Sequence, residues 1–252
     1  FIFESAKDNY GIDYQGEGLT IDGREKGIRK LMAINLLKRL ESSVNSFRLT
    51  LIRIHDFIKD SIAAIDKFEE SGAGAIDITD FTEDFDSEDT ENDPFVGRKS
   101  KINLRDMDYV RWRRDLQADV DVLELLIFML KDITPEHDAK LQQLVADLKN
   151  KFEHPINGNN KKVLIFTAFA DTANYLYEQL SGRILNDCGL HTALITGSTE
   201  GKSTLPRIKC SFNDILTYFS PVSKDRDAIH PNDTREIDVL IATDCISEGQ
   251  NL

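Results

Sequence analysis

Threonine is the first residue after each of three apolar runs in this sequence, at Thr167, Thr196 and Thr243. Short hydroxyl side chains and backbone N–H groups at such positions can hydrogen-bond phosphate oxygens without reading bases. Such positions therefore suit contact with phosphate groups, but apolar strands that end in threonine are common, so the pattern alone does not identify the partner.

The segment Gly201-Lys202-Ser203-Thr204 has the residue types of a phosphate-cradling loop between a strand and a helix. A Walker A loop needs four residues between its first glycine and the Gly-Lys pair. Only three residues separate Gly197 from Gly201. The spacing therefore argues against an independent nucleotide site in this segment.

An α/β sheet is predicted to position the three threonines. The runs Val163–Phe166, His191–Ile195 and Ile237–Ala242 are typical of strands buried on both faces. Helices are predicted from Asp171, a candidate cap, to about Ser181, and from Leu205 to Tyr218. This alternation predicts a parallel sheet with right-handed crossovers. Ligands of such sheets bind beyond the carboxyl ends of the strands, so the threonines are expected to share one functional edge.

A helical region is predicted over residues 24–152, ahead of an α/β domain over 153–252. Apolar residues recur at three- and four-residue steps up to Phe68, and no proline interrupts residues 24–70, which predicts one long helix or two shorter ones. Further helices are predicted over 105–131 and 136–152, the latter beginning near Pro135, so a helical hairpin or bundle is expected. Residues 1–23 lack a sustained period and are predicted to be an extended linker.

Charge is concentrated in one part of the chain. The net charge is -13, and nine of the 44 acidic residues lie between residues 77 and 93, where no basic residue occurs. A loop over about 75–97 is therefore predicted to be solvated and disordered, with DNA mimicry as a less favoured interpretation. The rest of the chain is close to balanced, so its composition does not exclude a nucleic-acid partner.

Trp112 lies among three arginines, Arg111, Arg113 and Arg114. An aromatic ring in a basic cluster can contact nucleic acid, but packing at the end of a helical bundle explains this cluster more simply.

Composition also argues against several other kinds of protein. The three cysteines, Cys188, Cys210 and Cys245, are far apart, which argues against a disulfide framework or a zinc site and favours a reducing, cytoplasmic setting. The five histidines lack metal-ligand spacing, so no metal site is predicted. No apolar run approaches the roughly 20 residues needed to cross a bilayer, and no membrane partner is expected.

The segment Ile237–Leu252, which reads IDVLIATDCISEGQNL, closely resembles motif V of superfamily 2 helicases. Val163–Thr172 resembles motif IV. Leu194–Ser198, followed by Arg207 and Phe212-Asn213, resembles the segment between those motifs. The three segments occur in the expected order and at matching distances, which makes the resemblance specific over about residues 155–252.

Two further segments resemble the bacterial Swi/Snf-like, RapA-like branch of these helicases. Lys38–Ser43 is similar to the helix that precedes the second motor domain, and Phe219-Ser220-Pro221 is similar to the stretch before motif V. The resemblance implies an incomplete RecA-like domain of P-loop NTPase-like fold, from a fragment that ends at motif V. It implies ATP and magnesium, bound mainly by the missing first RecA-like domain of the same parent chain, and double-stranded DNA as the nucleic acid.

The resemblance also implies two sets of site residues. The first would grip the nucleic-acid backbone: Thr167, Phe169, Thr196, Gly197 and Thr243. The second would couple that grip to the nucleotide: Asp244, Glu248, Gly249 and Asn251. In the second set, Gly249 would permit close approach of the chain to the nucleotide, and Asn251 would reach the ribose. Each residue also has a simpler structural interpretation, since Thr196-Gly197 could turn the chain and Asp244 could cap a helical turn.

Several helicase elements are missing from the sequence, which has no Walker A loop of correct spacing, no DExx box and no motif VI. No catalytic residue is therefore assigned, and this fragment alone is expected not to hydrolyse ATP. A dinucleotide-binding enzyme would need a glycine-rich first turn, which does not follow Ile165. A non-catalytic interaction module whose long helices dock a partner remains the alternative.

Overall fold

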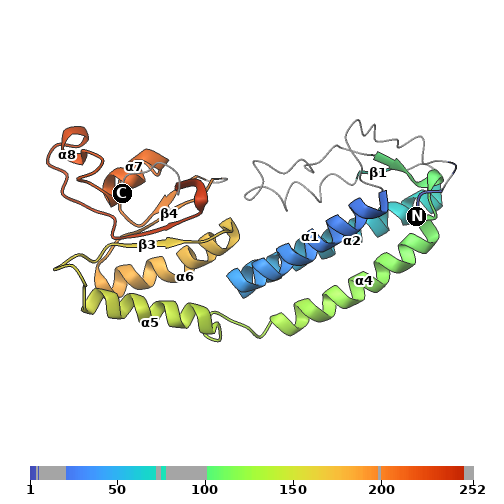
Figure 1. Ribbon diagram of the computed structural model, residues 1–252, viewed down its shortest axis with the longest axis horizontal. Helices are drawn as coiled ribbons and strands as arrows, with labels where there is room; N and C mark the ends of the chain where they lie inside the picture. The colour runs from blue at the N-terminus through green and yellow to red at the C-terminus, as the bar shows by residue number, and fades with distance from the viewer. Residues whose placement is uncertain (4, 6–20, 72–74, 78–100, 198–199, 247–252) are drawn as a thin grey trace. The chain divides into compact units, whose positions relative to one another are not determined.

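The computed structural model describes residues 1–252 except 4, 6–20, 72–74, 78–100, 198–199 and 247–252 (Figure 1). The chain is mixed α/β, and its Cα positions divide into two compact units. The first unit comprises residues 1–38 and 47–132; the second comprises residues 39–46 and 133–252. The predicted acidic loop over about 75–97 falls almost entirely outside the described residues.

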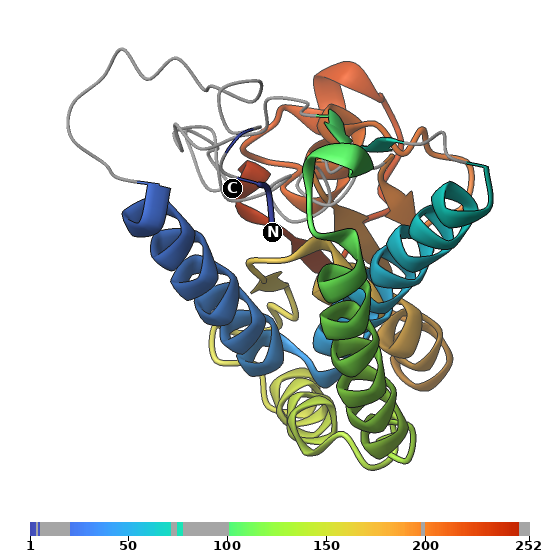
Figure 2. The same ribbon diagram turned by 90° about the vertical axis from the view of Figure 1, so that its right-hand side faces the viewer.

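The first unit contains α1 (Ile21–Ser42) up to Lys38, α2 (Val44–Ser71) from Phe47, and α4 (Tyr109–Leu130). The long helix expected from residue 24 is broken at Ser43, whose Oγ accepts hydrogen bonds from the backbone N–H groups of Asn45 and Ser46. This cap begins a new helix, and α1 and α2 diverge from it (Figure 2).

The core of the first unit lies between α2 and α4. Buried residues of α2 at helical spacing pack against Leu116 and Val120 of α4 and against Leu104 and Met107 just before it: Ile54, Ile58, Ile62, Ile65 and Phe68. Two short strands, β1 (Ala75–Asp77) and β2 (Lys101–Asn103), pair antiparallel, and a 3₁₀ turn, η2 (Leu104–Asp106), follows.

The chain start and the basic cluster both have structural roles in this unit. Within the predicted linker 1–23, Ile2 forms a β-bridge with Met107. Trp112 packs against the α2–α4 core, and Arg113 forms an ion pair with Asp66, which lowers the pKa of that carboxyl group. The Arg111 guanidinium lies 5.8 Å from the Phe1 ring centroid. These contacts favour the packing interpretation of the cluster.

The second unit is built on a four-stranded sheet of order β3-β6-β4-β5. The strands are β3 (Val163–Phe166), β4 (Thr192–Ile195), β5 (Lys202–Ser203) and β6 (Val239–Ala242). β6 pairs parallel with both β3 and β4, whereas β5 pairs antiparallel with β4. The predicted parallel arrangement of the three main strands is confirmed, and β5 was not predicted.

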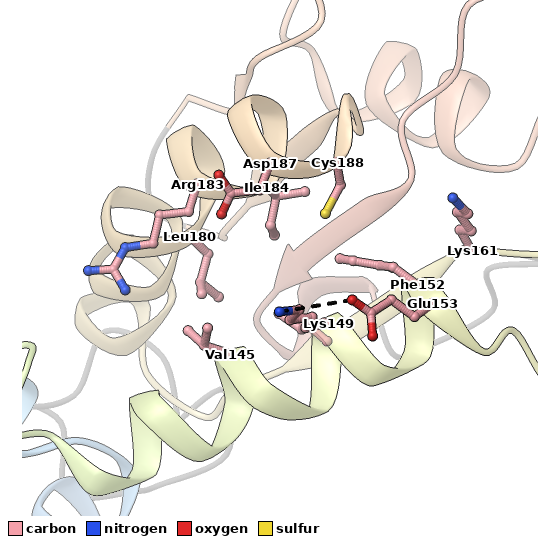
Figure 3. Close-up of a pocket in the computed structure, with 11 residues that line it drawn as sticks. Val145, Lys149, Phe152, Glu153, Lys161, Leu180, Arg183, Ile184, Asp187 and Cys188 are labelled. Atoms are coloured by element: carbon pink, nitrogen blue, oxygen red, sulfur yellow. Dashed lines mark ion pairs between the residues drawn. The ribbon is translucent and has the colours of Figure 1, made fainter.

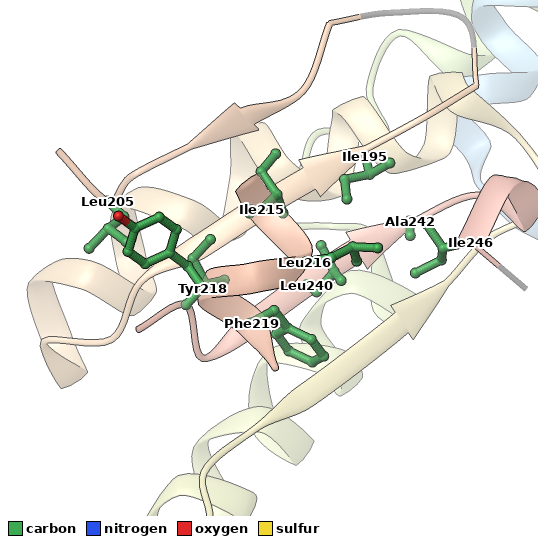
Figure 4. Close-up of a cluster of buried hydrophobic side chains, with 11 residues drawn as sticks. Ile195, Leu205, Ile215, Leu216, Tyr218, Phe219, Leu240, Ala242 and Ile246 are labelled. Carbon is green, nitrogen blue, oxygen red and sulfur yellow. The ribbon is translucent and has the colours of Figure 1, made fainter. Parts of the chain in front are cut away.

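Helices cover both faces of the sheet. α5 (Ala139–Glu153) and α6 (Ala170–Cys188) pack on one face through Leu148, Phe152, Leu180 and Ile184. α7 (Phe212–Phe219) covers the other face, where Ile215 and its neighbours form a second buried cluster (Figure 4). α5 belongs to the same unit as the sheet, although it was predicted as part of the helical region 24–152. Two short turns complete the unit, α8 (Arg226–Ile229) and η3 (Asp244–Ile246).

Several predicted helix boundaries are corrected, and local residues explain most of the changes. α4 begins at Tyr109 and α5 at Ala139 because Asp108 and Asp138 cap them, so Pro135 lies ahead of α5. α6 extends to Cys188, beyond the predicted end at Ser181, and stops at Gly189, whose φ of 68° is left-handed. The helix expected from Leu205 begins only at Phe212, after Ser211 caps it.

Candidate functional site at the carboxyl edge of the sheet

The parallel register sets the three threonines at the same level of the sheet. Phe166 of β3 and Ile195 of β4 both pair with Ala242 of the central strand β6. The next residue in each chain segment is Thr167, Thr196 or Thr243, so the three form a row across the carboxyl edge. Backbone hydrogen bonds continue past the strands, because the Thr167 N–H donates to the Ala242 carbonyl (3.0 Å) and the Thr243 N–H donates to the Ile195 carbonyl (3.2 Å).

The three threonine side chains are either hydrogen-bonded locally or buried. The Thr167 hydroxyl donates to the Phe169 carbonyl at 2.9 Å and accepts from the Phe169 N–H at 3.1 Å, which closes a local turn ahead of α6. Thr196 is 7% exposed and Thr243 is 4% exposed. Because these two side chains are nearly inaccessible to solvent, the exposed groups of the edge come from neighbouring residues.

Gly197 and Asp244 supply exposed groups beside the buried threonines. Asp244 is the first residue of the 3₁₀ turn η3, so it lies inside that turn and not at its N-cap, and its coupling role stays a prediction. The other three residues proposed for nucleotide coupling, Glu248, Gly249 and Asn251, lie outside the described residues. Their assignment stays a prediction.

Phe169 is buried and stacks on an arginine instead of facing solvent. It occupies the N-cap position of α6 without a side-chain cap, and it is 7% exposed. The guanidinium of Arg39 lies 4.6 Å from the Phe169 ring centroid, and Arg39 Nη1 lies 3.1 Å from Asp171 Oδ2. The predicted capping role of Asp171 is thus replaced by an ion pair, and the Phe169 ring is not positioned to stack on a base.

A cluster of contacts, here called the joint anchor, connects the α1–α2 junction to the first turns of α5 and α6. Its residues are Arg39, Glu41, Ser42, Lys140, Asp171 and Thr172. Besides the contacts of Arg39, the hydroxyls of Ser42 and Thr172 lie 2.9 Å apart. Lys140 Nζ donates to the carbonyl oxygens of Glu41 (2.6 Å) and Ser42 (3.2 Å), where a cation at the C-terminal end of α1 is favoured by the helix dipole. Arg39 Nε is buried and makes no hydrogen bond with the described residues.

The Gly-Lys-Ser segment forms the edge strand β5 and not a phosphate loop. Lys202 pairs with Leu194, and Gly201 is packed so closely that an added Cβ would lie 2.5 Å from the Cys210 carbonyl oxygen. The exposed Lys202 side chain reaches the carboxyl edge, where Nζ donates to Asn174 Oδ1 near the start of α6 (2.9 Å). An ammonium group has three donors, so Lys202 can also contact an anion.

Sequence reasoning missed two features of this edge. The rejected Walker A resemblance drew attention to Lys202, but no role at the edge was assigned to it. The pairing of Arg39 with Asp171 joins residues 132 positions apart, and no local pattern in one sequence indicates such a contact.

A second polar cluster lies toward the amino end of β6, away from this edge. Arg235 and the Tyr218 hydroxyl both donate to Asp233, at 2.7 and 2.9 Å. The hydrogen bonds from Arg235 hold the pKa of Asp233 well below its usual range, and burial raises the pKa of Tyr218. The Ile237 N–H donates to the Tyr218 carbonyl, so the cluster secures the entry into β6.

A groove of about 510 Å³ between α5 and α6 has an apolar floor that includes Phe152, Leu180 and Ile184 (Figure 3). On its rim Lys149 and Glu153 form an ion pair at 3.9 Å. The groove is mainly a packing seam between two helices, so the carboxyl edge remains the candidate site.

Comparison with protein-family models, curated proteins and solved structures gives no match. Among the described residues, no cluster of three or more histidine, cysteine or acidic side chains could hold a metal ion, and no helix has the length and apolarity to cross a membrane.

Proposed function

We propose that this chain is part of an ATP-dependent nucleic-acid translocase or helicase and contributes motifs IV to V of its second RecA-like domain. The observation that carries the proposal is the row of threonines at one level of the sheet. In that arrangement the described strands of three segments that resemble helicase motifs end at one edge of the sheet, and ligands of parallel α/β sheets bind at such edges.

In this proposal the edge grips the phosphate backbone of double-stranded DNA through its exposed groups. Exposed Gly197 offers close approach of the backbone, and Lys202 supplies a cation. Contacts of this kind position a protein on nucleic acid without specifying a base sequence.

The described residues do not fit a self-contained ATP site. The Gly-Lys-Ser segment that could cradle phosphates is a paired strand, and Gly201 is enclosed by Cys210 and Ile215. ATP and magnesium would therefore be held mainly by a first RecA-like domain of the parent protein. Asp244 would couple the edge to that nucleotide, together with the predicted residues Glu248, Gly249 and Asn251.

The deciding experiment measures ATP hydrolysis by the full-length parent protein, with and without double-stranded DNA, beside this chain alone. We expect DNA to stimulate the parent and the chain alone to be inactive. Hydrolysis by the chain alone would contradict the split-site arrangement. Absence of hydrolysis by the parent with any nucleic acid would favour the interaction-module alternative.

Replacing Lys202 with alanine is expected to weaken DNA binding by this chain equally for all base sequences. Each phosphate contact releases condensed counterions, so loss of one contact should reduce the slope of log K against log salt concentration by about 0.9. Fluorescence anisotropy with two unrelated duplexes over a salt series measures this slope. Lys149→Ala, in the α5–α6 groove, is the matched control. Equal salt slopes for the Lys202→Ala and Lys149→Ala variants would show that Lys202 does not contact the DNA.

A further inference from the structure

We propose that the outer face of α4 is a docking surface for a basic amphipathic helix of a partner protein. This face, here called the outer stripe, consists of Val122, Leu125, Leu126 and Met129. It lies entirely within the first unit. The inference does not depend on the motor function proposed above.

The outer stripe has the spacing of one continuous helix face. Its residues stand at positions i, i+3, i+4 and i+7, which lie side by side on an α-helix. Val122 is 57% exposed, Leu125 59%, Leu126 38% and Met129 63%. Contiguous exposed apolar side chains of this kind mark interaction sites more often than isolated ones do.

Packing within the first unit does not explain the outer stripe. α4 packs on α2 through Leu116 and Val120, with Leu123 beside them. At about 100° per residue, those positions lie on the side of the helix away from Leu125 and Met129. α4 therefore has two apolar faces, one of which forms the core of the unit.

Charges beside the outer stripe identify the kind of partner. By the same helical geometry, Asp119 flanks the stripe on one side and Asp121 flanks it on the other. Lys131 falls on the opposite side of the helix, where it lines a groove with Glu124 of α4 and Arg48 of α2. A helix seated on the stripe would therefore meet one carboxylate on each flank, which favours lysine or arginine at its own flanking positions.

A second copy of this chain fits the stripe poorly. Two outer stripes facing each other would bring their acidic flanks together, and like charges across an interface are unfavourable. A basic amphipathic helix, which presents an apolar stripe between cationic flanks, satisfies both features. The flexible thioether of Met129 can adapt to different apolar partners.

The test uses the whole chain and a labelled synthetic helical peptide of about 18 residues, with leucines at helical spacing flanked by lysines. A second peptide has the same leucines flanked by glutamates. In fluorescence anisotropy, we expect the lysine peptide to bind about tenfold more tightly than the glutamate peptide, with the difference shrinking at high salt.

Variants of α4 separate the outer stripe from other exposed positions. The double variant Leu125→Gln with Met129→Gln is expected to weaken binding of the lysine peptide by about tenfold or more. Val110→Gln is the matched control, because Val110 is a 60% exposed residue on the same helix outside the stripe. Unchanged circular dichroism melts show that each variant is folded.

A charge reversal tests the nature of the partner. Asp119→Lys combined with Asp121→Lys should reverse the preference, so that the glutamate peptide binds better. Equal binding of both peptides by the unmodified chain, or normal binding by the Leu125→Gln/Met129→Gln variant, would overturn the proposal. So would self-association in analytical ultracentrifugation that this double variant abolishes, since a second copy would then occupy the stripe.

Discussion

Replacing Asp171 with asparagine is expected to destabilise the second unit by about 3 kcal/mol, because it leaves the buried Arg39 cation without its carboxylate. Arg39→Met should cost about 2 kcal/mol, since Asp171 is the more exposed partner and water can reach part of its charge. The double variant should lose less stability than the sum of the losses in the two single variants, with a coupling energy of at least about 1 kcal/mol. Urea unfolding followed by circular dichroism measures all three values.

The chain contains an internal reference for this experiment. Its single tryptophan, Trp112, lies in the first unit, so tryptophan fluorescence reports on that unit while the joint anchor is altered in the second. The fluorescence transition should shift less than the dichroism transition. Lys38→Met, a change at the exposed residue beside Arg39, is the control for the loss of a cation. Strictly additive losses would show that Arg39 and Asp171 do not interact in solution.

Gly201→Ala is the second substitution with a large expected effect, a loss of about 2–3 kcal/mol from overpacking. The new Cβ would lie 2.5 Å from the Cys210 carbonyl oxygen, 2.6 Å from Ile215 Cδ1 and 3.2 Å from the Leu194 carbonyl oxygen. Two of these atoms belong to the backbone, so a side-chain rotation cannot relieve the contact. Thermal and urea unfolding measure the loss.

Gly182→Ala provides a matched comparison for Gly201→Ala. Gly182 lies within α6, is exposed, and has no atom within 4 Å of an added Cβ. Alanine there should stabilise the helix by about 0.5–1 kcal/mol, since glycine is a poor helix former. Adding Ile215→Val to Gly201→Ala should recover only part of the loss, because the backbone contacts remain. If Gly201→Ala left the stability unchanged, β5 would be able to move away from β4.

The main strands could be predicted because each is a short apolar run bounded by polar or turn residues. Val163–Phe166 and Val239–Ala242 fall within the predicted limits for that reason. β5 could not be predicted, since two residues carry no periodic signal. α7 is shorter than the apolar pattern from Leu205 predicted because Ser211 is its N-cap, and the Ser211 Oγ accepts a hydrogen bond from the Asp214 N–H.

The location of the candidate site at one edge of the sheet could be predicted, but the exposure and contacts of its side chains could not. Parallel topology alone implies that Thr167, Thr196 and Thr243 share one end of the sheet. The burial of Thr196 and Thr243, and the stacking of Phe169 on Arg39, depend on tertiary contacts. Sequence periodicity describes which face of an element is apolar, and it does not indicate what covers the residues beyond the element's end.

The order of strands in the sheet also has a consequence for folding. The central strand β6 is the last of the three parallel strands in the sequence, and β3 and β4 do not pair with each other. During synthesis the two earlier strands therefore have no parallel partner until residues 239–242 emerge. Contacts across long sequence separations form slowly, so the nascent unit would expose its apolar strands during that interval, when a chaperone could bind them.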